Sequence, residues 1–442
     1  MSLEVKYLPQ NYRTVYNPVE IVMFETDATT RNYTGFAYLI DVKVGATTIG
    51  RLRVPPTTNG FGRFDLSGLM KSYISSDVGL LNQSVTNAVL FNSNSFETFT
   101  LEFGWVHYNT GTATTSIPQT VTLPDTSTTS SQDIIVFNGS LANYRRDVVN
   151  FYDWQTTDYH LKYITNATTR KFLTNCPKGT TTGSNSLDVK LTDEGYIYFL
   201  LDESTNTFDT VAITRYNPTT APTTIEFSVP TLTNQRHCRI PLAPETLNNI
   251  SGLFVTSGSL PVISSTDTRY TVFLMYGGAR VSENMNLNIV SECRYETRRL
   301  EFLNSLGGFD YFNFTKVSKH SEEIERKFFK TNPSDLNTST GAIEYSISNR
   351  QKVQYYTTSK NKMKLNSDYM NVETYNWLLE LIESPEIYLL DSYTNPSGAT
   401  EIRRIPIQNI EGNWEEKTNS TDMLCSLSID IELGIDNFRQ TF

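Results

Sequence analysis

Clustered carboxylates come closest to a catalytic pattern in this chain, because two carboxyl groups at a suitable separation can hydrolyse a glycosidic bond. One cluster comprises Glu322, Glu323 and Glu325, and the other is Glu415-Glu416. Both lie in hydrophilic stretches close to Lys or Arg, a setting typical of solvated charge. Tryptophans could stack against sugars, but here they are spread along the chain and are expected in hydrophobic cores. They are Trp105, Trp154, Trp377 and Trp414. We therefore expect no catalytic residues and no enzymatic activity.

Histidine and cysteine show no metal-binding or nucleophile pattern. The four histidines stand alone, without HxH or HxxxH spacing, and are expected to be structural. They are His107, His160, His237 and His320. The four cysteines lie far apart with no CxxC pair, so we expect buried free thiols and a reducing compartment. They are Cys176, Cys238, Cys293 and Cys425. No GxSxG elbow and no GxxxxGK[ST] phosphate loop occurs, and the sequence predicts no metal and no cofactor.

Charge is distributed unevenly along the chain. The net charge of −10 argues against specific nucleic-acid binding, which needs a basic surface that displaces counterions from phosphates. Arg294–Lys364, however, holds thirteen Lys and Arg against eight Asp and Glu. This basic segment is either a solvated face or a contact for an acidic partner or for another copy of the chain.

The N-terminal residues MSLEVKYLPQNY contain neither the basic segment nor the apolar segment of a signal peptide, so we expect no secretory signal. No run of about 18 apolar residues occurs, and we expect no membrane partner.

Composition predicts a mainly β protein. Aromatic residues make up 12% of the 442 residues, and Thr and Asn are frequent. Aromatic and β-branched residues favour pleated surfaces, and Asn, Gly and Thr favour the turns between strands. A chain of this length exceeds one ordinary core. We expect a multi-domain β-sandwich-like architecture with a few short helices.

Three domains are expected. Residues 1–125 predict an N-terminal β-sandwich-like domain with a short helix near 65–76. Residues 134–293 predict a second β domain, because strand-like runs recur there at sandwich-like intervals. Residues 294–442 predict an α+β domain with a hairpin at 295–315 and a helix at 371–384. The polar stretch PDTSTTSSQD at 124–133 is the best candidate for a linker, or else a loop within one domain.

Local signals place the helices and the hairpin. Apolar residues recur with helical period from Leu66 to Ile74, with Asp65 suited to cap the first turn. A second apolar stripe runs from Val372 to Ile382, with Asn371 as its cap. Gly307-Gly308 separates two strand-like runs, and glycine reaches positive φ without steric cost, so a hairpin is expected there.

Three segments resemble structural proteins of tailed bacteriophages, in particular ring, collar or distal-tail-type proteins from phages of Bacteroidetes, including the crAss-like group. The segments are Asn59–Ser76, Arg299–Thr315 and Glu373–Asp391, the last followed by the closing alternating strand. The resemblance implies a non-enzymatic virion protein that is made in the host bacterial cytoplasm. It also implies self-association into a homo-oligomeric ring in the tail or neck, where the ring joins neighbouring tail proteins.

A ring requires head-to-tail contacts between copies. We expect the hairpin arm and the charged run after it to form a subunit or partner contact. Its predicted residues are Phe309, Tyr311, Phe312, Phe314, Lys316, Lys319, Arg326 and Lys327. The alternative for the aromatic residues is an internal hairpin in its own domain core. Two other functions stay open: a receptor- or glycan-binding tail spike or fibre protein, and a glycan-degrading tail enzyme.

Overall fold

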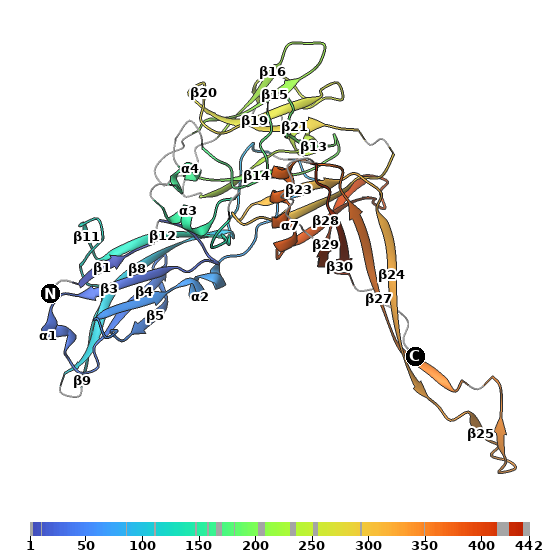
Figure 1. The fold of residues 1–442 in the computed structure, drawn as a ribbon, viewed down its shortest axis with the longest axis horizontal. Coiled ribbons are helices and arrows are strands. Elements are labelled where there is room, and N and C mark those ends of the chain that lie inside the picture. The colour runs from blue at the N-terminus through green and yellow to red at the C-terminus, as the bar shows by residue number, and fades with distance from the viewer. Residues whose placement is uncertain are drawn as a thin grey trace. The chain divides into compact units, whose positions relative to one another are not determined.

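The computed structural model is mainly β, as the composition predicts, with short helices between its strands (Figure 1). It describes residues 3–9, 11–84, 86–109, 112–145, 148–156, 159–164, 170–180, 182–201, 208–229, 236–250, 255–291, 294–348, 350–412 and 424–435. The chain forms two compact units. The first unit comprises Met1–Ser291, Phe302–Tyr311 and Asn376–Ser384, and the second comprises Glu292–Glu301, Phe312–Tyr375 and Pro385–Phe442.

The N-terminal part of the first unit is built on two sheets that share one hydrophobic core. The first sheet, in spatial order, contains β11 (Thr128–Thr129), β10 (Val121–Thr122), β1 (Leu3–Tyr7), β3 (Glu20–Glu25) and β6 (Phe61–Asp65). The second contains β2 (Tyr12–Thr14), β12 (Ser131–Phe137), β8 (Phe96–Asn109), β4 (Ala37–Val44) and β5 (Thr47–Val54), with β9 (Thr112–Ser116) paired to β8. Buried residues from both sheets, such as Ile21 and Phe103, fill this core. The arrangement is sandwich-like, as expected.

Two further sheets belong to the first unit. The larger contains β13 (Leu187–Val189), β21 (Met285–Ile289), β19 (Arg269–Tyr276), β15 (Thr210–Tyr216), β16 (Thr223–Ser228) and β18 (Val255–Ser257), with β20 (Ala279–Arg280) paired to β19. The smaller contains β14 (Tyr196–Leu200), β17 (His237–Pro241) and β7 (Leu90–Phe91). Helices α1 (Ala28–Arg31), α3 (Phe151–Gln155), α4 (Leu161–Ile164) and α5 (Pro244–Asn248) lie between strands. The sequence also predicts a strand at 252–256, of which residues 252–254 lie outside the described residues.

A seven-stranded sheet, most of which belongs to the second unit, ends in a long ribbon. Its strands, in spatial order, are β23 (Phe309–Phe314), β22 (Arg298–Leu303), β28 (Ile387–Thr394), β29 (Thr400–Gly412), β30 (Ser428–Leu433), β27 (Lys352–Asn366) and β24 (Lys319–Lys330). A separate hairpin joins β25 (Ser334–Leu336) to β26 (Ile343–Tyr345). Figure 1 shows β24 and β27 running side by side, with β25 beyond their far end. We call β24, β27 and this small hairpin the arm.

Both predicted helices are present. The first comprises α2 (Ser67–Met70) and the 3₁₀ turn η1 (Lys71–Tyr73). Asp65 Oδ1 accepts from the Ser67 amide at 3.0 Å, so its carboxylate satisfies a first-turn donor as predicted, although Leu66 holds the cap position. The second comprises α6 (Val372–Trp377) and α7 (Leu379–Glu383), and Asn371 Oδ1 accepts from the Thr374 amide at 2.7 Å.

The polar stretch at 124–133 is paired rather than a spacer. It contains β11 and the first residues of β12, and Ser131 faces Glu102 of β8 in the ladder. The expectation of a linker was wrong, because this segment forms strands that pair with β8 and β10. The segment has no alternating apolar side chains from which those strands could have been predicted. The three-domain division by residue ranges stays a prediction beside the two units.

The predicted hairpin forms with its turn at Gly307-Gly308. The Asn304 amide donates to the Gly308 carbonyl at 2.8 Å, and the Gly307 amide donates to the Asn304 carbonyl at 3.1 Å. Gly307 has φ +86°, and a Cβ placed on it would lie 1.7 Å from the Asn138 carbonyl oxygen. The position therefore requires glycine for both its conformation and its close approach to another backbone segment.

Candidate functional site

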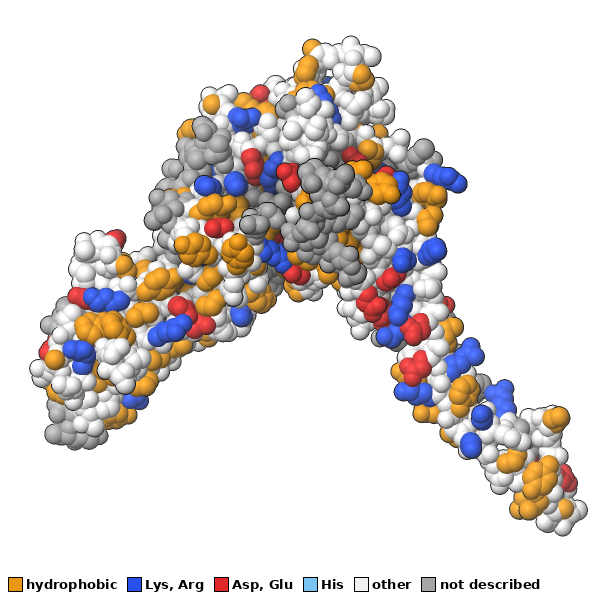
Figure 2. Space-filling view, in the orientation of Figure 1, with side chains coloured by type: hydrophobic (Ala, Val, Ile, Leu, Met, Phe, Trp, Pro, Cys, Tyr) orange, Lys and Arg blue, Asp and Glu red, His pale blue; other side chains and the backbone are white. Residues whose placement is uncertain are grey.

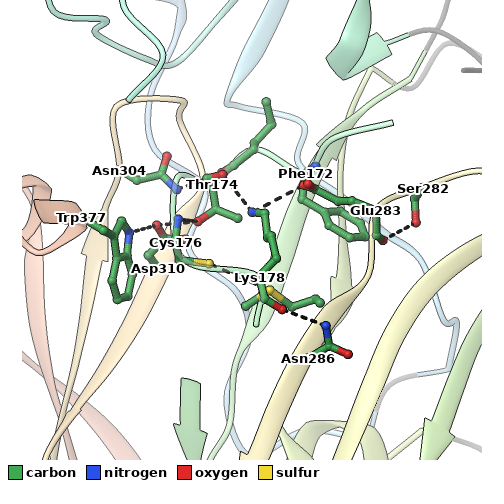
Figure 3. Close-up of polar contacts among 12 residues, drawn as sticks. Phe172, Thr174, Cys176, Lys178, Ser282, Glu283, Asn286, Asn304, Asp310 and Trp377 are labelled. Atoms are coloured by element: carbon green, nitrogen blue, oxygen red, sulfur yellow. Dashed lines mark hydrogen bonds and ion pairs between the residues drawn. The ribbon is translucent and has the colours of Figure 1, made fainter. Parts of the chain in front are cut away.

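A buried carboxylate lies just after the turn of the hairpin. Asp310, on β23, is buried, and its Oδ2 accepts from Trp377 Nε1 at 2.9 Å and from Thr174 Oγ1 at 2.8 Å (Figure 3). Burial raises the pKa of Asp310 to about 6, against the opposing effect of these hydrogen bonds. Asp310 and its two partners are far apart in the sequence, so these hydrogen bonds connect three segments of the first unit.

The hairpin turn beside Asp310 is fixed by a single asparagine. Asn304 Oδ1 accepts from the amides of Leu306 and Gly308 at 3.0 and 3.1 Å. Its Nδ2 donates to the Leu173 carbonyl at 2.9 Å, next to Thr174 in the chain. One buried side chain therefore forms hydrogen bonds with backbone groups of both the turn and the neighbouring segment, and buried polar groups require such partners.

A second buried carboxylate, Glu380 on α7, holds the first residue of the same turn. Its Oε1 accepts from Asn175 Nδ2 at 2.7 Å and from Ser305 Oγ at 3.0 Å, while Oε2 accepts from the Ser305 amide at 3.3 Å. Burial, together with the nearby charge of Asp310, raises the pKa of Glu380 to about 7. We refer to Asp310, Glu380 and their hydrogen-bond partners as the carboxylate cluster.

A lysine and a thiol border this cluster. Lys178 Nζ donates to the Thr174 carbonyl at 3.0 Å and lies 3.5 Å from Glu283 Oε1. The Cys176 thiol is buried, with its Sγ 4.0 Å from Met285 Sδ (Figure 3). Burial raises the pKa of Cys176 to about 12, so the thiol stays protonated and unreactive at neutral pH.

The carboxylate cluster has the chemistry of a structural hydrogen-bond network. Carboxyl groups with a pKa near neutrality are frequent in active sites, where they face a substrate. Here, Asp310 and Glu380 are both buried and hydrogen-bonded to protein donors. Within the described part of the chain, no group of three or more His, Cys, Asp or Glu side chains is arranged to hold a metal ion.

A serine–histidine pair, which the sequence did not reveal, lies elsewhere in the first unit. Ser95 Oγ is 2.6 Å from His237 Nδ1, and Asn92 Nδ2 is 2.7 Å from the same nitrogen. An amide NH₂ can only donate, so Nδ1 is an acceptor and the ring proton is on Nε2. Burial, then the charge of Arg239, lowers the pKa of His237 to about 3. The buried ring is a weak base, and this pair has the properties of a core hydrogen bond.

The other residues considered from the sequence are placed as follows. Buried positions are occupied by Trp105, Trp154, Trp377, His107, His160 and His237. Three cysteines are free and buried as expected, namely Cys176, Cys238 and Cys425. His320 and the carboxylates Glu322, Glu323 and Glu325 are exposed on β24, which agrees with solvated charge. Cys293, Trp414 and Glu415-Glu416 lie outside the described residues.

The structure separates the eight predicted contact residues into two groups. Phe309, Tyr311 and Phe314 are buried, which agrees with the alternative of an internal hairpin, and Phe312 is half-buried. The cations are exposed, and they are Lys316, Lys319, Arg326 and Lys327. The buried group is unavailable to a partner because both faces of β23 are covered. For Phe312 and the four cations a contact stays a prediction.

The arm is a two-stranded ribbon over most of its length. β24 pairs with β27 from Lys319–Lys364 to Lys330–Lys352, whereas β30 supports β27 only between Lys362 and Asn366. All twelve residues of β24 are exposed, and β24 has no strand on its other side among those that the structure describes. A long ribbon of this kind has little core of its own.

No family model and no curated protein matches this chain. Among solved structures, it is similar to the full extracellular region of plexin A4, with 8% identity and a TM-score of 0.19 over 99% of this chain and 36% of that one. It is also similar to the FN1–FN3 domains of chicken CNTN1, with 10% identity and a TM-score of 0.16 over 66% of this chain and 69% of that one. TM-scores this low assign neither a fold family nor a function.

The far end of the arm exposes apolar side chains. In the β25–β26 hairpin, Leu336 lies opposite Ile343, and Tyr345 follows on the same face by strand alternation. Their exposed fractions are 64%, 63% and 76%, respectively. Asp335 and Glu344 lie opposite each other on the other face. Hydrophobic, basic and acidic side chains recur along the arm in Figure 2. Exposed apolar groups clustered at the end of a projecting ribbon are typical of interaction sites.

The described residues include no helix with the length and apolar character needed to cross a membrane.

Proposed function

We propose that this chain is a non-enzymatic structural subunit of a tailed-phage virion that self-associates into a ring in the tail or neck and joins neighbouring tail proteins. The observation that supports this most is the arm, whose strand β24 is exposed at every position. The phage context rests on the resemblance of three sequence segments, and the comparisons with known proteins are silent on it.

The energetics of the arm support an assembly role. Ordering a backbone residue costs about 1–2 kcal/mol, and burial of apolar surface normally offsets that cost. An isolated two-stranded hairpin is marginally stable in water for this reason. The β24–β27 ribbon extends well past its support from β30 and ends in exposed Leu336, Ile343 and Tyr345. Association with another protein surface would bury these side chains and stabilise the ribbon.

The burial and hydrogen bonding of the other candidate sites also support a structural role. The carboxylate cluster and the Ser95–His237 pair are buried and engaged with protein partners. In this conformation, neither site exposes one of these side chains to a substrate.

The test is the assembly state of the full chain. We expect light scattering after gel filtration at low salt to give a mass several times 50.2 kDa, and negative-stain electron microscopy to show closed rings. A monomer across the accessible concentration range would contradict self-association. Elongated monomers or trimers that bind a glycan array would instead favour the receptor-binding function.

A further inference from the structure

The register of the arm places five of its lysines on one face. Residues directly opposite in an antiparallel pair share a face, and residues two apart in a strand share it as well. Lys319 is opposite Lys364, and Glu323 is opposite Lys360. This face, which we call the lysine face, therefore contains Lys319, Glu323, Glu325, Lys327, Lys360, Lys362 and Lys364.

The orientation of the lysine face follows from its neighbours in the strand. Met363 and Leu365 of β27 are buried and pair with Ile431 and Ile429 of β30. Lys364 alternates with them and is exposed. The lysine face thus points away from the core of the second unit.

The lysine face has more positive charge than the arm neutralises. Lys362 pairs with Glu323 at 2.8 Å and Lys327 lies 3.8 Å from Glu325. At the base of the arm, Glu432 of β30 lies 3.0 Å from Lys360, and Asp430 is opposite Lys364. Like charges directly opposite in a sheet are destabilising, yet Lys319 and Lys364 face each other, and neither forms an ion pair with the residues that the structure describes. A basic segment that is only partly neutralised is attracted to an acidic surface.

The rest of the chain has an excess of acidic residues. Residues 316–366 contain ten Lys and Arg against five Asp and Glu, whereas the whole chain contains 37 against 47. The remaining residues therefore have 27 basic against 42 acidic side chains. The arm and the rest of the chain have opposite net charge, so two copies attract when the arm of one approaches the other.

We propose that the arm docks on a second copy of this chain, with the lysine face against an acidic surface and the apolar face of the β25–β26 hairpin buried at the same contact. This inference rests on the proposed self-association and specifies which surface performs it. The lysines steer the encounter and set its dependence on salt, and Leu336, Ile343 and Tyr345 supply the apolar burial that holds the contact.

Two double variants of the full chain test the two parts of this contact. Lys319→Glu with Lys364→Glu reverses two charges of the lysine face and leaves like charges facing each other at this pair, as in the wild type. Ile343→Ser with Tyr345→Ser removes apolar surface from exposed positions. Matched controls in the first unit are Lys71→Glu with Arg280→Glu, and Leu80→Ser with Tyr152→Ser, all at exposed residues.

Sedimentation velocity at several salt concentrations is the readout. We expect wild-type association to weaken as salt rises, each arm variant to raise the dissociation constant about tenfold or more, and the controls to match the wild type. The charge-reversed variant should also lose most of the salt dependence. Circular dichroism confirms that each variant is folded.

The outcomes separate this inference from the proposed function. A wild-type protein that oligomerises equally well with both arm variants would overturn docking through the arm, while leaving self-association in place. A monomeric wild type would overturn both, and capture of the arm by an unrelated acidic protein would then explain its charge.

Discussion

The indole Nε1 of Trp377 donates to Oδ2 of Asp310 at 2.9 Å, and both residues are buried within the first unit. The same oxygen accepts from Thr174, which lies 136 positions from Asp310 in the chain. A buried carboxylate with two donors couples segments that have no local reason to meet. Since a buried donor without an acceptor is costly, the stability of the first unit should depend strongly on this one side chain.

Replacement of Asp310 by alanine should destabilise the first unit by about 2–3 kcal/mol, because Trp377 Nε1 and Thr174 Oγ1 both lose their acceptor in a buried site. Chemical denaturation followed by tryptophan fluorescence measures the change. Asp335→Ala, at an exposed position of the arm, is the matched control and should have little effect. Equal stability of the two variants would contradict a fastening role for Asp310.

The contribution of Asp310 and Glu380 to the stability of the first unit should fall as the pH rises from about 4 to above 7. Burial raises the pKa of Asp310 to about 6 and that of Glu380 to about 7, both above the values near 4 of an unfolded chain. The folded state thus binds more protons across this interval, and its stability is full below the unfolded pKa and falls as each group ionises.

Glu380→Gln tests the assignment of this pH dependence. The amide keeps an acceptor for Asn175 and Ser305 but cannot ionise, so the slope of unfolding free energy against pH should become shallower between pH 5 and 8. Urea denaturation across this range gives the slope. Glu344→Gln, at an exposed position, should leave the slope as in the wild type. An unchanged slope in Glu380→Gln would contradict the role of this carboxyl group.

Short-range sequence patterns predicted the two helices and the hairpin, which are determined by residues close together in the chain. The helices at 67–73 and 372–383 follow from apolar period and capping residues, and the hairpin follows from Gly307-Gly308. β24 was not predicted as a strand, because Glu and Lys are depleted in strands and give a weak local preference. Its twelve residues are extended because β27 pairs with them along their whole length.

The candidate sites depend on topology, which short-range patterns do not encode. In the run FDYFNF, alternation would leave one face exposed, yet all of its residues except Phe312 are buried. Both sides of β23 are covered, so Asp310 is enclosed despite its charge. Ser95 and His237 lie 142 positions apart and meet only through the pairing of β7 with β17 nearby. No spacing rule could have joined them.

Ser95 should not react as an activated nucleophile. The neighbouring His237 has a pKa lowered to about 3 by burial, and both side chains are buried. Incubation of the folded protein with a fluorophosphonate, followed by peptide mass spectrometry, should leave Ser95 unmodified. Ser95→Ala should cost about 1 kcal/mol of stability through the lost hydrogen bond to the ring. Stoichiometric labelling of Ser95 would instead show an accessible, activated serine and would reopen the enzymatic hypothesis.

Gly307→Ala should be among the most damaging single-methyl changes in the chain. The residue has φ +86°, and an added Cβ would lie 1.7 Å from the Asn138 carbonyl oxygen, which is backbone and cannot move aside easily. Gly398 has the same φ of +86° with nothing within 4 Å of its added Cβ, so Gly398→Ala reports the conformational strain alone. We expect about 1–2 kcal/mol for Gly398→Ala and a clearly larger loss for Gly307→Ala, measured by thermal denaturation of each variant. If the two substitutions were equally tolerated, the close approach between the hairpin turn and Asn138 could not be part of the folded protein.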